Sequence, residues 1–298
     1  MSRLLISLLL AASVVLPASA QQAPPPGAES SPDAIVVQGI RDQKKEIGKF
    51  VDALTPAPVL GQLSRFDWAV CPAAVGLGEA HNQAIAKRMR AVAKAAAMPV
   101  AGDDCRPNAL LIVAPDKAEL IDQLRSKYPA YFERVSEHDI KQLKRGPSPA
   151  AAWQVKGLLD ADGVEVPYDS VNDYYVVERT DISSRLKTTT RPHFIASIVV
   201  VELSAINGLT ATQLADYAAM RAFAATDPAR VKSKEAQTIL AALEAPMNSP
   251  VPLTLTEWDL AFLKALYASD PERTATSQRN EMKQIVRRTL QDGRKGEE

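Results

Sequence analysis

Few residues of this chain have side chains typical of catalysis or metal binding. There are two cysteines, Cys71 and Cys105, and three histidines, His81, His138 and His193. No histidine lies within four residues of another histidine or of a cysteine, so the HExxH and CxxC spacings of zinc sites are absent from the sequence. We therefore predict no metal and no cofactor, and we expect the two cysteines to matter as a pair.

Motifs for nucleophiles and phosphates are also missing. The G-x-S-x-G elbow does not occur, and Gly76-Leu77-Gly78 lacks the rest of a phosphate loop. Asp160 to Gly163 begins like a calcium loop, but no glutamate follows at the required position. We therefore predict a non-catalytic binding protein. The alternative is a hydrolase whose site is built from residues distant in sequence, with His193, Glu202 and Asp216 as candidates.

The first twenty residues have the composition of a secretory signal peptide. An apolar run from Leu4 to Pro17 follows Arg3, and Ala18-Ser19-Ala20 supplies the small residues of a cleavage site. This run is shorter than the roughly 20 apolar residues of a membrane span. We expect residues 1–20 to be removed, leaving a periplasmic or secreted chain that starts at Gln21 and has no transmembrane segment.

Export bears directly on the cysteines, because the compartments outside the cytoplasm are oxidising. We therefore expect a disulfide between Cys71 and Cys105. The alternative is a pair of thiolate metal ligands, but no further ligand lies near them in the sequence.

The charges of the chain balance, with 35 basic and 35 acidic residues. This balance gives no electrostatic reason to expect nucleic acid or an anionic membrane surface as a partner. At 46% apolar and 23% charged residues, the chain resembles an ordinary globular protein with a sizeable core. The partner is unknown from sequence, and an envelope protein is the class left open.

Apolar patterning predicts a single α/β domain over residues 34–291, with a mixed sheet and flanking helices. The region 34–205 is expected to be rich in strands and 208–291 to be helical, whereas 21–33 is expected to be a disordered tether and 292–298 a frayed tail. The expected strands are 34–39, 66–70, 110–113, a hairpin around Gly163, 174–178 and 194–203. The expected helices are 42–54, 79–97, a helix capped by Asp116, 210–225, 233–243, a helix capped by Thr256 and 277–290.

The start of the helix at 210–225 is the best candidate for a ligand site. It follows the strongest strand signal, 195–201, which we expect to be central in the sheet. Ligands of α/β proteins bind where strands end and helices begin, because unpaired backbone donors collect there. The polar and turn residues at this position are Asn207, Gly208, Thr210, Gln213, Asp216 and Tyr217.

Four local strings resemble a group of uncharacterised exported proteins of Gram-negative bacteria, over about residues 60–225. These strings are Phe66–Pro72, Gly76-Leu77, Cys105–Asn108 and Leu214–Met220. The order of parts is also similar to that of zincin-like metalloproteases, and 253–259 resembles the closing helix of a putative-lipoprotein family with that arrangement. A zincin carries two histidines and a glutamate on the helix after its edge strand. Helix 210–225 contains neither residue type, so the resemblance implies a degenerate, metal-free arrangement used for binding.

The segment Asp33–Gly39 resembles the short energy-coupling box near the start of outer-membrane receptors. That box pairs as an added strand with a periplasmic partner. The resemblance implies a third hypothesis, an interaction module that docks through strand 35–37. The alternative is that this segment is simply the first strand of the folded domain.

Overall fold

The computed structural model describes residues 32–55, 58, 60–169, 171–172, 174–177, 188–231, 237–246 and 249–295. The signal peptide expected over 1–20 and most of the tether expected over 21–33 lie outside these residues. The chain divides into two compact units, residues 1–40 and 41–298. Of the first unit, the structure describes only the helical stretch from Pro32 to Ile40.

The first helix, α1 (Pro32–Leu54), occupies the segment in which we expected a strand over 34–39. That prediction is wrong, and with it the proposed docking strand 35–37, because helical residues offer no strand edge. The β-branched residues favour a strand only weakly. Pro32 at the first helical position and Asp33 in the first turn are both favourable for a helix start.

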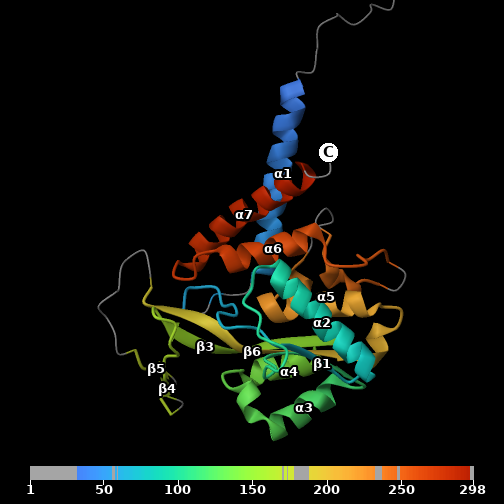
Figure 1. The fold of residues 1–298 in the computed structure, drawn as a ribbon, viewed down its shortest axis with the longest axis vertical. Coiled ribbons are helices and arrows are strands. Elements are labelled where there is room, and N and C mark those ends of the chain that lie inside the picture. The colour runs from blue at the N-terminus through green and yellow to red at the C-terminus, as the bar shows by residue number, and fades with distance from the viewer. Residues whose placement is uncertain are drawn as a thin grey trace, which may run out of the picture. The chain divides into compact units, whose positions relative to one another are not determined.

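A four-stranded mixed sheet forms the centre of the second unit (Figure 1). Its strands are β1 (Pro72–Val75), β2 (Ala109–Ala114), β6 (Thr190–Glu202) and β3 (Ala150–Asp160), in this order across the sheet. β1, β2 and β6 are parallel, and β3 pairs with β6 in the antiparallel sense. The α/β class and the interior position of the 195–201 segment are thereby confirmed.

The first strand of the sheet begins later than expected. Residues 66–70 are not a strand: Val70 forms only an isolated bridge to Val100, and β1 starts at Pro72. We expected the strand to lie before Pro72, but proline, which lacks a backbone donor, is tolerated at the first position of a strand.

Helices cover both faces of the sheet (Figure 1). The larger core joins β1, β2 and β6 to α1, α2 (Glu79–Ala95), α5 (Ala211–Ala224), α6 (Glu257–Ala268) and α7 (Ala275–Lys295). The smaller core lies on the other face, against α3 (Lys117–Lys127), η1 (Pro129–Phe132) and α4 (Glu137–Arg145). Alternation along β6 divides the two cores: Val199 and Val201 belong to the larger, and Ile198 and Val200 to the smaller.

Several shorter elements differ from expectation. The strand expected at 174–178 is reduced to β5 (Tyr174–Tyr175), paired with β4 (Tyr168–Asp169). Of the helix expected at 233–243, residues 233–236 lie outside the described part, and the rest contains only the 3-10 helix η4 (Ile239–Leu243). α7 remains helical to Lys295, beyond the start of the expected frayed tail. Two further 3-10 helices are η2 (Leu203–Ile206) and η3 (Pro228–Arg230).

The expected disulfide is confirmed. Cys71 and Cys105 are bonded, with an S–S distance of 2.05 Å and a Cα–Cα distance of 6.1 Å. The bridge ties the residue before β1 to the loop before β2, and the guanidinium of Arg90 lies 3.1 Å from the sulfur of Cys105. Among the described helices, none combines the length and the apolar character needed to span a membrane.

Candidate functional site

The residues at the start of α5 mainly hold the helix itself. Thr210 and Gln213 form a capping box: the Thr210 hydroxyl accepts from the Gln213 backbone N–H at 3.1 Å, and the side-chain Oε1 of Gln213 accepts from the Thr210 backbone N–H at 3.0 Å. Such caps satisfy backbone donors that a ligand would otherwise meet. Asn207 and Gly208 are exposed in the turn before it, where Gly208 has a φ of +83°.

Asp216 has a structural role in the core. Its side chain is completely buried and accepts hydrogen bonds from the Arg88 guanidinium at 2.7 and 3.0 Å. It also accepts from the Thr254 hydroxyl and the Leu255 backbone N–H. All of these donors come from the protein, so Asp216 joins α2, α5 and the segment before α6.

Tyr217 is likewise completely buried, and this burial raises the pKa of its hydroxyl. The hydroxyl accepts from Arg221 at 2.7 Å and donates to Glu244 at 3.3 Å. Of the six residues expected to form the site, only Thr210 lines one of the cavities described here, a mostly apolar pocket of about 380 Å³ between the starts of α2 and α5. Tyr217 instead contacts two residues of a larger cavity.

The candidate hydrolase residues do not converge. His193 and Glu202 lie near opposite ends of β6, nine residues apart, which corresponds to roughly 30 Å of extended chain. His193 is fully buried, with no hydrogen-bond partner for either ring nitrogen among the described residues, and burial lowers its pKa to about 4. Asp216 is held by Arg88. Nor do the described residues contain a group of three or more histidine, cysteine, aspartate or glutamate side chains placed to hold a metal.

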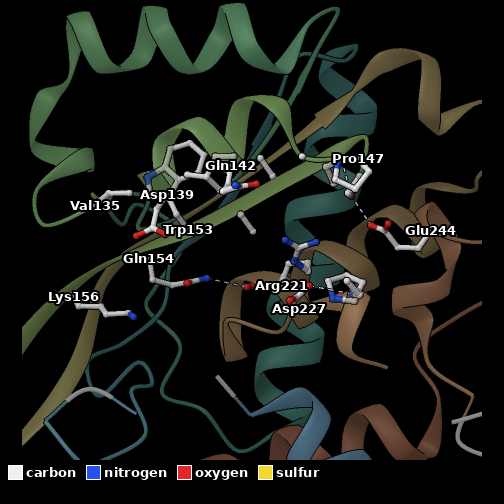
Figure 2. Close-up of a pocket in the computed structure, with 18 of the residues that line it drawn as sticks. Val135, Asp139, Gln142, Pro147, Trp153, Gln154, Lys156, Arg221, Asp227 and Glu244 are labelled. Carbon is white, nitrogen blue, oxygen red and sulfur yellow. Dashed lines mark hydrogen bonds between the residues drawn. The ribbon is translucent and has the colours of Figure 1, made fainter. Parts of the chain in front are cut away.

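The larger cavity, of about 770 Å³, follows strand β3 and is called here the β3 groove. One wall comes from the segment after η1 and from α4, and the opposite wall from α5, η3 and η4 (Figure 2). The lining is Glu133, Arg134, Val135, Asp139, Gln142, Leu143, Gly146, Pro147, Ser148, Ala150, Ala151, Ala152, Trp153, Gln154, Lys156, Arg221, Asp227, Pro228, Ala229 and Glu244.

The groove crosses the open edge of the sheet. β3 is an outer strand, and successive residues of a strand point to opposite faces. Trp153 belongs to the core beneath α4, whereas the Gln154 amide reaches across the other face to the Arg221 carbonyl oxygen at 3.0 Å. Since side chains from both faces line one cavity, the edge of β3 between them is exposed to that cavity.

Arg221 supplies the most unusual charge in the groove. Only 8% of its surface is exposed, yet its one hydrogen-bonded side-chain contact is with the neutral Tyr217 hydroxyl, and its Nε has no partner among the described residues. Figure 2 shows its guanidinium directed toward β3, between Gln154 and Pro147. A buried cation is costly unless an anion or several acceptors accompany it.

Three of the four acidic residues that line the groove accept hydrogen bonds from protein donors. Glu244 accepts from the Ser148 hydroxyl at 2.6 Å, Asp227 from the Ala229 N–H, and Asp139 from the Ser136 hydroxyl. With these three carboxylates engaged, the strongest candidate for recognising a ligand is the Arg221 guanidinium, whose Nε has no partner among the described residues.

A second cation lies farther along β3. Lys156 projects on the same side of the strand as Gln154 (Figure 2). Burial lowers the pKa of its ammonium group, partly offset by the charge of Asp139.

Known proteins offer no guide to this groove. Comparisons with protein-family models, curated proteins and solved structures gave no match. The resemblance to zincin-like proteins therefore stays a prediction.

Sequence reasoning missed the groove, although one signal was present. Arg221 is the only strongly basic residue of α5, a helix that is otherwise rich in alanine and apolar residues. A lone cation on a buried helix needs a partner. The partners themselves could not be found from sequence, because β3, η3 and η4 come together only in the fold.

Proposed function

We propose that the protein is an exported, non-catalytic binding protein whose ligand lies in the β3 groove and carries a carboxylate that pairs with Arg221. The observation that supports this most directly is the buried Arg221 guanidinium, which lines the cavity and whose Nε has no hydrogen-bond partner among the described residues. A guanidinium matches a carboxylate with two parallel hydrogen bonds, and such charge-assisted pairs are among the strongest in proteins.

The size of the groove fits this proposal. Small-molecule and cofactor sites typically have volumes of about 300–1,000 Å³ and combine an apolar lining with a few polar groups. The groove has a volume of about 770 Å³, and its lining includes the apolar Trp153 and Leu143 as well as the polar Arg221 and Gln154. Export is supported by the signal-like composition of residues 1–20 and by the disulfide between Cys71 and Cys105.

The proposal can be tested with N-acetyl-alanine, a probe that has one carboxylate and one amide. Adding it to the wild-type protein should move the Nε–H resonance of Arg221 in nitrogen-15 NMR spectra in a saturable manner. Arg221→Gln should weaken binding at least tenfold, whereas Thr210→Ala at the start of α5 should leave it unchanged. If the Arg221 resonance does not shift as the probe concentration is raised, the proposal is refuted. This outcome does not depend on how any variant folds.

A further inference from the structure

The open edge of β3 can be mapped residue by residue. The Glu202 backbone N–H donates to the Pro149 carbonyl oxygen at 3.0 Å, so position 149 faces β6. Backbone groups alternate along a strand, so 151, 153 and 155 also face β6, and 150, 152, 154 and 156 face away from it. The Val166 N–H confirms this assignment, because it reaches the Leu158 carbonyl oxygen from the outer side at 2.7 Å.

Among the residues that the structure describes, none pairs with the outer backbone groups over one stretch of β3. A hydroxyl from Ser148 accepts from the Ala150 N–H at 3.1 Å, and from Leu158 onward the edge pairs with residues 164–166. Ala152, Gln154 and Lys156 lie between these points, and all three line the groove. The open stretch from 150 to 156 is about 20 Å long in an extended strand.

Resting on the proposed function, we infer that the ligand is the extended C-terminal tail of a partner polypeptide, which adds to β3 as an antiparallel strand. The added strand would use the open N–H and C=O groups of Ala152 and Gln154, in the manner of other strand-addition sites. Arg221 lies on the Pro147 side of Gln154 in Figure 2, toward the start of β3. A tail whose terminal carboxylate lies at Arg221 and whose preceding residues extend toward Lys156 is therefore antiparallel to β3.

The walls of the groove also indicate the side chains of such a tail. One wall presents Val135, Leu143 and Trp153, and the other presents Gln154, Lys156 and Arg221. Alternate side chains of an added strand point to opposite walls. Acidic side chains on the second wall would pair with Lys156 and Arg221, so we expect a tail in which apolar and acidic residues alternate and which ends in a free carboxylate.

The test uses the wild-type protein and an acetylated pentapeptide of alternating leucine and glutamate with a free C-terminus. Isothermal titration should show binding at least tenfold tighter than that of N-acetyl-alanine. The same peptide with an amidated C-terminus should bind at least tenfold more weakly. An amidated peptide of equal affinity would overturn the inference in favour of side-chain carboxylates.

Two further peptides test the strand geometry. N-methylation of alternate backbone nitrogens removes either the donors that face β3 or those that face away from it. We expect one of the two N-methylated peptides to lose at least tenfold in affinity and the other to retain it. Strand addition would be overturned if both N-methylated peptides bound with the same affinity, or if the pentapeptide bound no more tightly than N-acetyl-alanine. Either result would leave the proposed carboxylate site intact. Failure of N-acetyl-alanine and the pentapeptide together would overturn the proposed function as well.

Discussion

At the scale of single residues, His193 is the clearest case of a buried titratable group. It is fully buried against the ring of Trp68, with a centroid distance of 4.6 Å. Its pKa is lowered from 6.5 to about 4 by burial. The unfolded chain therefore binds a proton more readily than the folded protein between these pH values, and stability is lost as the pH falls from about 6.5 toward 4.

We predict that this loss amounts to about 3 kcal/mol when the pH has dropped below 4. Urea unfolding of the wild-type protein and of His193→Gln at pH 7 and pH 4 would measure it, since the glutamine variant lacks the titration. The same pH dependence in both proteins would show that other groups account for the acid sensitivity.

Residue-level prediction from sequence succeeded where the signal is local. Asp116, Thr210 and Thr256 cap the helices that follow them, as their types and positions indicate. It failed for Arg221, whose surroundings come from segments far apart in the chain. The sequence also predicted that Asp216 and Tyr217 face a ligand, whereas both are buried and hydrogen-bonded to other residues of the protein.

At the scale of elements, the turn after β1 depends on a close approach between strands. Gly76 has a φ of +100°, and a Cβ placed on it would lie 1.9 Å from the carbonyl oxygen of Val113 in β2. Only glycine adopts this conformation readily and leaves room for the neighbouring backbone.

We predict that Gly76→Ala destabilises the protein by more than about 2 kcal/mol, because backbone strain and steric conflict add. Gly102→Ala is the matched control, since a Cβ there would meet nothing within 4 Å, and we expect it to change stability by less than about 0.5 kcal/mol. Thermal unfolding of the two variants side by side would measure this difference. Equal melting temperatures would contradict the close approach between Gly76 and Val113.

Elements were predicted well where one periodicity dominates and poorly where two signals compete. The strand at 195–201 and the helices after Thr210 and Thr256 carry long, clear patterns. The segment 34–39 combines β-branched residues with a helix-start signal, and the helix prevails. Residues 233–243 were expected to form an α-helix. In the described part of this range, the buried Asp259 carboxylate accepts from the Thr238 hydroxyl and the Ile239 N–H, and a short 3-10 helix, η4, follows.

At the scale of the whole molecule, the disulfide is the covalent constraint on the α/β unit. Its partners are 34 residues apart in sequence, and closing a loop of this length stabilises a fold by about 4 kcal/mol in the chain-entropy model. We predict a loss of this size for the double variant Cys71→Ser with Cys105→Ser in urea unfolding. The intact protein should show no thiol that reacts under denaturing, non-reducing conditions, and two reactive thiols or unchanged stability of the variant would contradict the prediction.

The recessed position of the β3 edge decides which molecules can reach it. Open strand edges commonly join folded proteins sheet to sheet, which leads to aggregation. Here the edge lies between two walls, so another sheet would have to bring its own covering helices or strands into the groove. A single chain needs only the spacing of one strand, about 4.8 Å from β3. We therefore expect the walls to favour unstructured tails over folded sheets, and the edge of β3 to pair less readily with other copies of the protein than a fully exposed edge would.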